Sequence, residues 1–317
     1  MTVRFNPLRN PQQMSELISS VTGEPTEQVL ERLHDEFRYP GSEVGSDFKG
    51  HGLTPHVWDD GLVEFYQQTD AFLYELSMWN CNRLKRRMRL YTRRALQPLR
   101  SGDPKLDVLT VGDGLGFDCL SLARAGHRTT YFEMPGYSSR FAKTLFGNSG
   151  VDIPMITNPT AIPHKAFDAV VCLDVLEHVP DPAAMVGDLV GYLRDDGLLI
   201  AHAPFYLIDA TYPTHLRANR RFSGDLTLYG RHGLKLVDAA PFWNPLVLSR
   251  QPRATQTRSG AATRRKVAKL VGWLFRFARL TTMPFRLALR YQRHGSRWFG
   301  DTWSGIPETN RRLRQRV

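Results

Sequence analysis

The stretch Leu106–Gly116, LDVLTVGDGLG, joins a short apolar run to a glycine-rich turn, and the helical pattern FDCLSLARAG follows directly. A strand that leads through such a turn into a helix presents backbone N–H groups and a helix N-terminus to the polar end of a ligand. Glycine is needed where the chain turns tightly or where a ligand approaches the backbone closely. The spacing is GxGxG rather than the GxGxxG preferred for a pyrophosphate. The turn by itself is therefore only a weak indication of a cofactor site.

An acidic residue stands at the end of the next predicted strand, in the stretch TTYFEMPG. This residue, Glu133, follows Gly116 by 17 positions. A carboxylate at this place can accept hydrogen bonds from both hydroxyls of a ribose. The alternative is an ordinary solvated glutamate at a strand end. The glycine turn and Glu133 together favour a site for a ribose-bearing cofactor.

Between Leu106 and about Arg250 apolar strand patterns alternate with helical patterns. Strands are predicted at 106–111, 128–132, 151–156, 169–173, 198–202, 234–237 and 246–248, and helices at 117–126, 137–147 and 181–194. Such alternation is typical of a parallel sheet that is covered by helices on both faces. The predicted fold class is therefore α/β.

Residues 166–205, AFDAVVCLDVLEHVPDPAAMVGDLVGYLRDDGLLIAHAPF, supply a third element. This stretch resembles the fourth-strand region of class I S-adenosylmethionine (SAM)-dependent methyltransferases, where FDxVxxxxVLEHxxDP precedes a helix and a DGxLxxxxP strand. With the turn and the acid, the resemblance covers about residues 105–205. It implies a seven-stranded Rossmann-like methyltransferase sheet with helices on both faces and SAM as the cofactor.

The resemblance also implies positions for SAM: its methionine and ribose against the glycines of the turn, and its ribose hydroxyls on Glu133. Two positions depart from the family's pattern. Thr110 replaces an acid that usually helps to hold the methionine amino group, a contact that Asp113 or Asp118 can replace. Asn158 replaces an acid near the adenine amino group, and its amide oxygen can still accept from that amine. The predicted cofactor-binding residues are Gly112, Asp113, Gly114, Gly116, Glu133, Asn158 and Leu173.

Methyl transfer from a sulfonium requires a nucleophile in line with the methyl group and, for a hydroxyl, removal of a proton. In the family this site lies just beyond the fourth strand. His178 is the first candidate base because imidazole titrates near neutral pH, although it can equally serve only to orient the loop. His215, in the aromatic insert Phe205–Phe222, is the second, with a loop-capping role as the alternative. The predicted catalytic residues are His178, His215 and Asp174.

No metal is predicted, although one donor set near the fourth strand is suitable. Asp174, Glu177 and His178 would suit Mg²⁺, Mn²⁺ or Zn²⁺. This segment resembles the metal-binding segment of the ubiquinone-biosynthesis O-methyltransferases, but most relatives with the VLEH pattern use no metal. The three cysteines are too few and too scattered for a zinc cage or a disulfide framework, and they fit a reducing compartment.

Residues 1–104 are predicted to form a helical N-terminal cap. Helices are expected from Pro11, with Asn10 as N-cap, over 26–37, and over 60–99 as one long or broken helix. The glycine-rich residues 39–56 are predicted to be neither helix nor strand. Phe65, Phe72 and Trp79 recur every seven residues, a stripe typical of core packing. A role in roofing the substrate pocket is the alternative.

The net charge of +11 belongs to the end of the chain. Residues 250–317 hold 17 Lys/Arg against two acids, whereas residues 1–249 hold 25 basic and 29 acidic residues. After a linker-like stretch, a basic helix is predicted with one apolar side, which consists of Val267, Leu270, Val271, Leu274, Phe277 and Ala278. Such helices are typical of membrane surfaces, so residues 266–297 are a candidate contact with an anionic membrane. Packing on the sheet is the alternative, and a nucleic-acid contact is the least favoured interpretation.

The sequence thus predicts a cap (1–104), a SAM-binding methyltransferase domain (105–249) and a basic, helical C-terminal tail (250–317). No apolar run is long enough to cross a membrane. The sequence therefore predicts a cytoplasmic protein, with peripheral binding at the inner membrane face as an additional expectation from the basic tail. The predicted reaction is O-methylation of a small-molecule, sugar- or lipid-linked hydroxyl. The rivals are an RNA or protein methyltransferase anchored by the tail, and a non-catalytic Rossmann-like scaffold whose Thr110 signals a decayed site.

Overall fold

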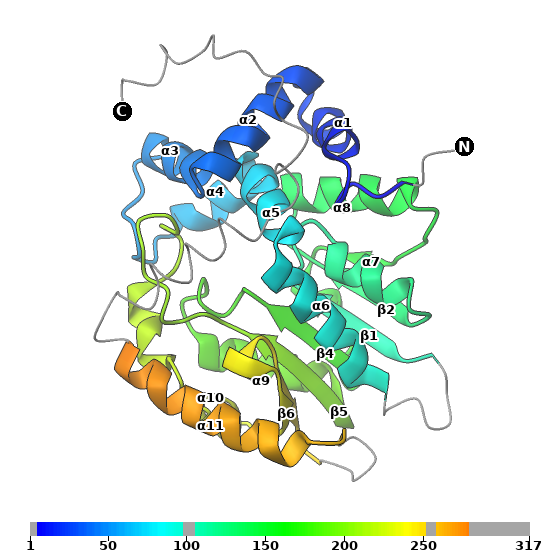
Figure 1. The fold of residues 1–317 in the computed structure, drawn as a ribbon, viewed down its shortest axis with the longest axis vertical. Helices are drawn as coiled ribbons and strands as arrows, with labels where there is room; N and C mark the ends of the chain where they lie inside the picture. Colours follow the sequence, from blue (N-terminus) through cyan, green and yellow to red (C-terminus); the bar gives the residue numbers. More distant parts are fainter. Residues whose placement is uncertain (1–4, 98–104, 252–257, 279–317) are drawn as a thin grey trace.

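A seven-stranded sheet forms the centre of the computed structural model, which describes residues 5–97, 105–251 and 258–278 (Figure 1). The strand order is β3-β2-β1-β4-β5-β7-β6, and β7 runs antiparallel to both of its neighbours. This order confirms the predicted α/β class and the seven-stranded sheet. The strands are β1 Asp107–Val111, β2 Arg128–Phe132, β3 Met155–Ile156, β4 Phe167–Leu173, β5 Leu193–His202, β6 Lys235–Ala239 and β7 Leu246–Ser249.

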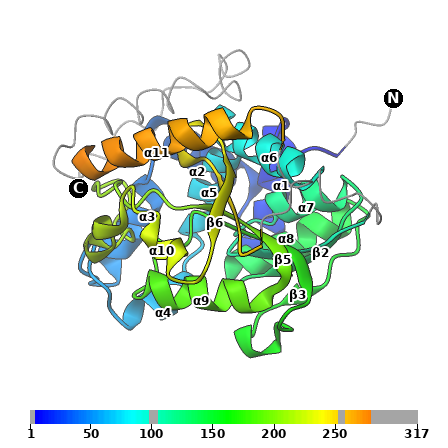
Figure 2. The ribbon, with the colours of Figure 1, turned by 90° about the horizontal axis from the view of Figure 1, so that it is seen from below.

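Helices cover both faces of the sheet because successive side chains of its central strands point to opposite sides. In β4, Val171 packs in one core cluster with Met88 of α6, whereas Val170 packs in another with Val186 of α9. Figure 2 shows α6 on one side of the sheet and α9 and α10 on the other. The helices that follow the first strand are α7 Phe117–Ala123, α8 Tyr137–Asn148, α9 Pro182–Tyr192, α10 Thr227–Gly230 and α11 Ala261–Ala278.

Six helices precede β1 within the described residues, and five of them form a cap over the carboxyl edge of the sheet (Figure 1). The first begins as predicted, with the Asn10 side chain accepting hydrogen bonds from the N–H groups of Gln12 and Gln13. The predicted helix over 60–99 is broken into three. The six helices are α1 Pro11–Thr22, α2 Thr26–Arg38, α3 Ser42–Gly50, α4 Gly61–Gln68, α5 Ala71–Cys81 and α6 Arg83–Leu96.

The prediction that residues 39–56 contain no helix was wrong, because α3 lies within them. Tertiary contacts compensate for the poor helix propensity of its glycines. The buried carboxylate of Glu36 accepts hydrogen bonds from the backbone N–H groups of Gly41 and Glu43, and so caps the start of α3 from the preceding helix. Val44 and Phe48 are fully buried on its inner face. A cap supplied by another helix leaves no local sequence signal.

The helix α11 packs against β6 and the adjoining loop through one edge of the apolar face predicted for it. Val271 of that face is buried together with Ala268, whereas Val267, Leu270 and Leu274 of the same face are exposed. The reason is a close approach at Gly272, where a Cβ would lie 2.4 Å from the ring of Trp243. The Trp243 indole N–H donates to the carbonyl of Ala268 over 2.7 Å. Small side chains thus let the helix lie directly on the loop.

Candidate active site

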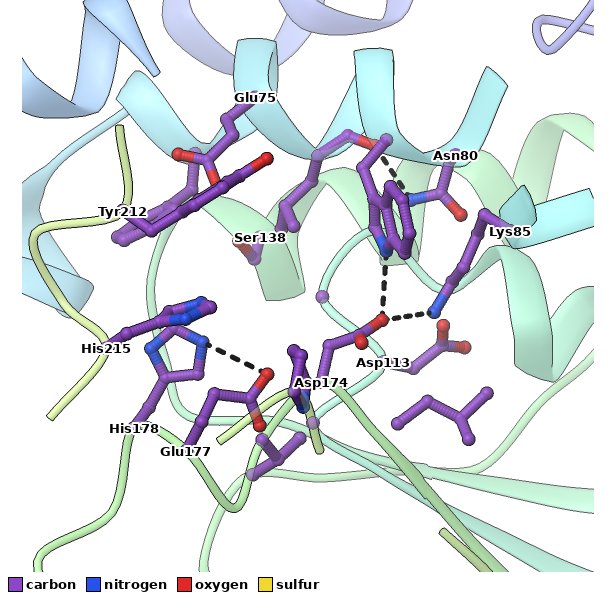
Figure 3. A pocket seen from close by; sticks show the side chains of 18 of the residues that line it. Glu75, Asn80, Lys85, Asp113, Ser138, Asp174, Glu177, His178, Tyr212 and His215 are labelled. Atoms are coloured by element: carbon purple, nitrogen blue, oxygen red, sulfur yellow. Dashed lines mark hydrogen bonds and ion pairs between the residues drawn. The ribbon is translucent and has the colours of Figure 1, made fainter. Parts of the chain in front are cut away.

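A cavity of about 380 Å³ lies between the cap and the carboxyl ends of β1, β4 and β5. The glycine turn after β1 and the residues after β4 form one side of it, and α4, α5 and the start of α6 form another. The loop that follows β5 contributes the remaining wall. Figure 3 shows labelled side chains from the glycine turn, from α5 and α6, and from the segments after β4 and β5 converging on the same space. The sheet edge and the cap therefore build one site together.

The glycine turn has two glycines in the cavity and one outside it. Gly112 and Gly114 line the cavity with positive φ angles of 67° and 58°. A Cβ on Gly112 would lie 2.4 Å from Val175 and one on Gly114 would lie 2.7 Å from Leu76, so neither place has room for a side chain. Gly116 instead packs against α8, and its position does not support the predicted contact with the cofactor.

The two acids proposed to replace the missing acid at Thr110 are both engaged by the chain. Asp113 lines the cavity, but its carboxylate accepts hydrogen bonds from the backbone N–H groups of Asp118 and Cys119, which caps α7. Asp118 is buried and pairs with Lys85 at 3.0 Å and with Arg89 at 2.7 Å. Thr110 itself is buried within β1. Both acids therefore stabilise the turn.

Glu133 lies at the end of β2 and lines the cavity next to the turn. One carboxylate oxygen accepts the N–H of Gly114 at 2.8 Å, and the other accepts the N–H of Met134 at 2.9 Å. Burial raises the pKa of this carboxyl, and the two N–H donors oppose the rise. Each oxygen keeps further acceptor capacity, which is the chemistry that two ribose hydroxyls require. The residues of the turn and of β2 thus fit a ribose-bearing cofactor.

Two further predicted cofactor contacts lie in different places. Leu173, the last residue of β4, lines the cavity beside the turn. Asn158 is exposed and lies outside the cavity lining, and its side-chain oxygen accepts hydrogen bonds from the backbone N–H and the hydroxyl of Thr160. The structure therefore brings Leu173 to the site and does not bring Asn158 there.

Asp174 adopts a positive φ of 63° directly after β4 and is surrounded by donors. Its carboxylate accepts hydrogen bonds from Trp79 Nε1 at 2.9 Å and Lys85 Nζ at 3.1 Å, and it pairs with His202 Nδ1 (Figure 3). Lys85 and His202 hold the pKa of this buried carboxyl well below its usual range. A carboxylate so fully engaged is a poor base, so its position favours a positioning role over the predicted catalytic one.

The remaining chemical groups converge on the other side of the cavity (Figure 3). Glu177, His178 and His215 each offer one ligand atom, and these atoms lie within 4.8 Å of one another. Of the set predicted as a weaker metal candidate, Glu177 and His178 are included, but His215 stands in place of Asp174. His215 Nδ1 donates to the carbonyl of Leu207 at 2.7 Å, which leaves Nε2 as an acceptor. The Tyr66 hydroxyl lies 3.0 Å from His178 Nδ1.

Burial sets the protonation of this cluster. It lowers the pKa of His178 to about 4 and that of His215 well below the usual value, and His178 further lowers the latter. Both imidazoles are therefore neutral at pH 7 and able to accept a proton. Burial, together with Asp174, raises the pKa of Glu177 well above its usual range. Neither Glu177 oxygen has a hydrogen-bond partner among the described residues, although the side chain is only 1% exposed.

Sequence reasoning missed Lys85, His202 and Glu75, which all line the cavity. A signal for Lys85 exists in α6, where it shares a helical stripe with the buried residues Met88 and Thr92. A lysine on an apolar stripe indicates a buried ion pair. No comparable signal marks Glu75, nor His202, whose role depends on its contact with Asp174 after another strand.

Comparisons with known proteins agree with this geometry. Residues 109–201 match the family described as Methyltransferase domain. Among curated proteins, the chain is 32% identical over 100 residues to the ubiquinone biosynthesis O-methyltransferase of Actinobacillus pleuropneumoniae serotype 5b, covering 29% of this chain and 43% of the relative. It is 38% identical over 84 residues to that of Pseudoalteromonas translucida, covering 25% and 36%. The chain spans less than half the length of these relatives.

Two solved structures are also similar to this chain. The SAM-dependent methyltransferase from Mesorhizobium loti has a TM-score of 0.37 at 15% identity, covering 51% of this chain and 88% of that one. The 1,6-didemethyltoxoflavin-N1-methyltransferase of Burkholderia thailandensis has a TM-score of 0.39 at 16% identity, covering 65% and 85%. These values are too low to support further argument.

The strand order of the sheet, the glycine turn and the family match together define the class of protein. Residues 109–201 belong to a class I SAM-dependent methyltransferase domain, a family that implies SAM as the cofactor. The matched residues run from β1 to β5 and contain the turn, Glu133, Glu177 and His178, whereas His215 lies beyond them.

Replacing Glu133 by Ala should weaken SAM binding by about 10- to 100-fold, because two hydrogen bonds to a charged acceptor are lost. The matched variant His178→Ala should change it by less than about threefold. Isothermal titration calorimetry with SAM measures both. Equal losses in the two variants would contradict the roles assigned to them.

Replacing Lys85 by Met should lower the free energy of unfolding by about 3–5 kcal/mol, since Asp118 and Asp174 would lose their shared buried partner. The matched variant Arg87→Met, on the exposed side of the same helix, should cost no more than about 0.5 kcal/mol. Equilibrium unfolding in urea gives both values. A loss below about 1 kcal/mol for Lys85→Met would show that the buried ion pairs of Lys85 are not needed for the stability of the fold.

Proposed function

We propose that the protein transfers the methyl group of SAM to a hydroxyl oxygen of an acceptor that binds under the cap. The observation that carries this proposal is the continuity of one cavity, which holds Glu133 and the glycine turn together with His178 and His215. A cofactor site and a candidate base thus share the same enclosed space. The match over residues 109–201 supports the cofactor half of the proposal, and the geometry of the two histidines supports the acceptor half.

Bound SAM supplies an electrophilic methyl group on a sulfonium. Glu133 and the backbone of Gly112 and Gly114 hold the cofactor. The acceptor hydroxyl donates its hydrogen bond to His215 Nε2, whose partner nitrogen is kept protonated by the carbonyl of Leu207. As the oxygen attacks, its proton passes to that nitrogen. His178 borders the same hydroxyl. Its ring is oriented by the hydrogen bond between its Nδ1 atom and the Tyr66 hydroxyl.

The walls of the acceptor side are largely aromatic. Trp58, Tyr66, Phe72, Tyr206 and Tyr212 line the cavity, and Tyr66 and Phe72 stack at 5.0 Å between ring centroids. Such walls suit a flat or apolar acceptor that carries a few polar groups. We therefore infer a small molecule, or the ring end of a lipid-linked one, as acceptor. The similarity to ubiquinone biosynthesis O-methyltransferases agrees with an acceptor of this kind.

A divalent metal held by Glu177, His178 and His215 is a second way to activate the hydroxyl. The observation in its favour is the buried Glu177 carboxyl without a hydrogen-bond partner among the described residues. Two neutral imidazoles and one carboxylate suit such an ion. We favour the metal-free route, since burial raises the pKa of the Glu177 carboxyl and so disfavours the carboxylate form that a metal ion requires.

Removing divalent metals should therefore leave methyl transfer unchanged. The measurement is transfer of tritiated methyl groups to separate small-molecule, lipid, RNA and protein fractions of a cell extract, before and after dialysis of the protein against EDTA. Loss of activity that returns with Mg²⁺, Mn²⁺ or Zn²⁺ would establish the metal route instead. A preference for RNA or protein fractions would contradict a small acceptor, and failure of SAM to stabilise the protein thermally would indicate a scaffold.

Replacing His215 by Asn should lower kcat by about 10²- to 10⁴-fold through loss of the base, with SAM affinity retained. The rate of the unaltered protein should show no acidic limb near the ordinary histidine pKa of about 6.5, because burial lowers the pKa of both histidines below that value. Single-turnover rates at saturating SAM test both statements. An acidic limb centred near the ordinary histidine pKa of about 6.5 would contradict the buried, neutral pair.

A further inference from the structure

The outward face of α11 is apolar, although the helix belongs to the most basic part of the chain. Val267, Leu270, Trp273 and Leu274 are 43–60% exposed and lie on the side of the helix away from the sheet. Single exposed apolar side chains are ordinary, but four on one helical face form a continuous stripe. Among the described residues, no helix is long and apolar enough to span a bilayer.

The helix α6 adds positive charge to the same region. Its exposed residues include five arginines, Arg83, Arg86, Arg87, Arg93 and Arg94. Lys266 and Lys269 are exposed on α11. Neither helix contains an aspartate or a glutamate. The two helices therefore present many cations with no acid of their own to neutralise them.

Both helices lie on the same side of the sheet, as Figure 2 shows. Arg258, which shortly precedes α11, lies over the ring of Tyr91 on α6, with 5.1 Å between the guanidinium carbon and the ring centroid. Arg264 of α11 pairs with Asp238 of β6 at 2.6 Å. These contacts fix α11 beside α6. The exposed arginines of α6 and the apolar stripe of α11 consequently belong to one region of the surface.

We propose that α6 and α11 form a docking face for an anionic phospholipid membrane. The arginines of α6 contact the phosphate headgroups, and the stripe of α11 enters the boundary between headgroups and acyl chains. A polyanion such as RNA would use the charges but leave the apolar stripe in water. A second copy of the chain would bring basic surface against basic surface. Only a lipid surface matches both properties.

The position of α6 connects this face with the cavity. Leu84 and Lys85 at its start line the cavity, while Arg83 and Arg86 beside them are exposed. Docking through α6 thus brings the cavity close to the bilayer, where a lipid-linked acceptor would reside. The docking face does not depend on the proposed reaction, because membrane binding can be measured without SAM or an acceptor.

The test is flotation of the full chain with vesicles of phosphatidylcholine alone, or with about a third of phosphatidylglycerol. The protein should float with the anionic vesicles only, and high salt should weaken the binding. Replacing Arg86, Arg87 and Arg93 by Gln should lower vesicle affinity at least about tenfold. The matched control changes three exposed cations elsewhere, Arg140, Lys143 and Arg231, to Gln, and should have little effect.

The apolar stripe is tested separately by Leu270→Asn, with Val57→Asn on the cap as its matched control. Both side chains are more than half exposed, so neither change should alter folding, which thermal unfolding checks. Leu270→Asn should weaken vesicle binding several-fold, and Val57→Asn should not. Equal binding to neutral vesicles, equal losses in the controls, or an arginine effect without a Leu270 effect would overturn the proposal. The last result, with poly(U) binding as tight as vesicle binding, would identify a polyanion site.

Discussion

The carboxylate of Asp174 is a buried negative charge at the carboxyl end of β4, and the structure must neutralise it. A buried carboxylate is costly unless it is paired and hydrogen-bonded. Its partners come from three elements: Trp79 of α5, Lys85 of α6 and His202 of β5. Lys85 in turn pairs with Asp118 of α7. One charge requirement therefore joins the cap to the sheet.

This arrangement explains why the predicted cofactor site and the proposed acceptor site lie in one cavity. The pairing with Lys85 and Trp79 draws the junction of α5 and α6 toward the glycine turn, where Leu76 of α5 lies against Gly114. The preceding helix, α4, extends the cap to the histidine cluster, where its Tyr66 lies next to His178. The cap is therefore a wall of the site and not an appendage. Its removal would open both halves of the cavity.

Much of the fold could be predicted from sequence, because its signals are local. The alternation of apolar strands and helices and the turn around Gly112 depend only on neighbouring residues. The cap of α3 could not be predicted, since Glu36 reaches it from another helix. Nor could the packed face of α11, which depends on the approach of Gly272 to Trp243.

Within the site, the sequence predicted which residues line the cavity better than it predicted what each of them does there. The turn, Glu133, His178 and His215 all line the cavity. The role of Asp174 depends on Lys85 and His202, which lie far away in the sequence, and a motif does not reveal such partners. Asn158 was expected at the cavity from the family's pattern, but a local turn with Thr160 engages its side chain.

The most direct test of the account is hydrogen–deuterium exchange of the full chain with and without S-adenosylhomocysteine. If the cofactor binds at the glycine turn beneath the cap, the product should slow exchange in residues 112–118, in residues 133–136 and in α5. Exchange in α9, on the opposite face of the sheet, should remain unchanged. Protection confined to other segments, or no protection at the turn, would contradict the account.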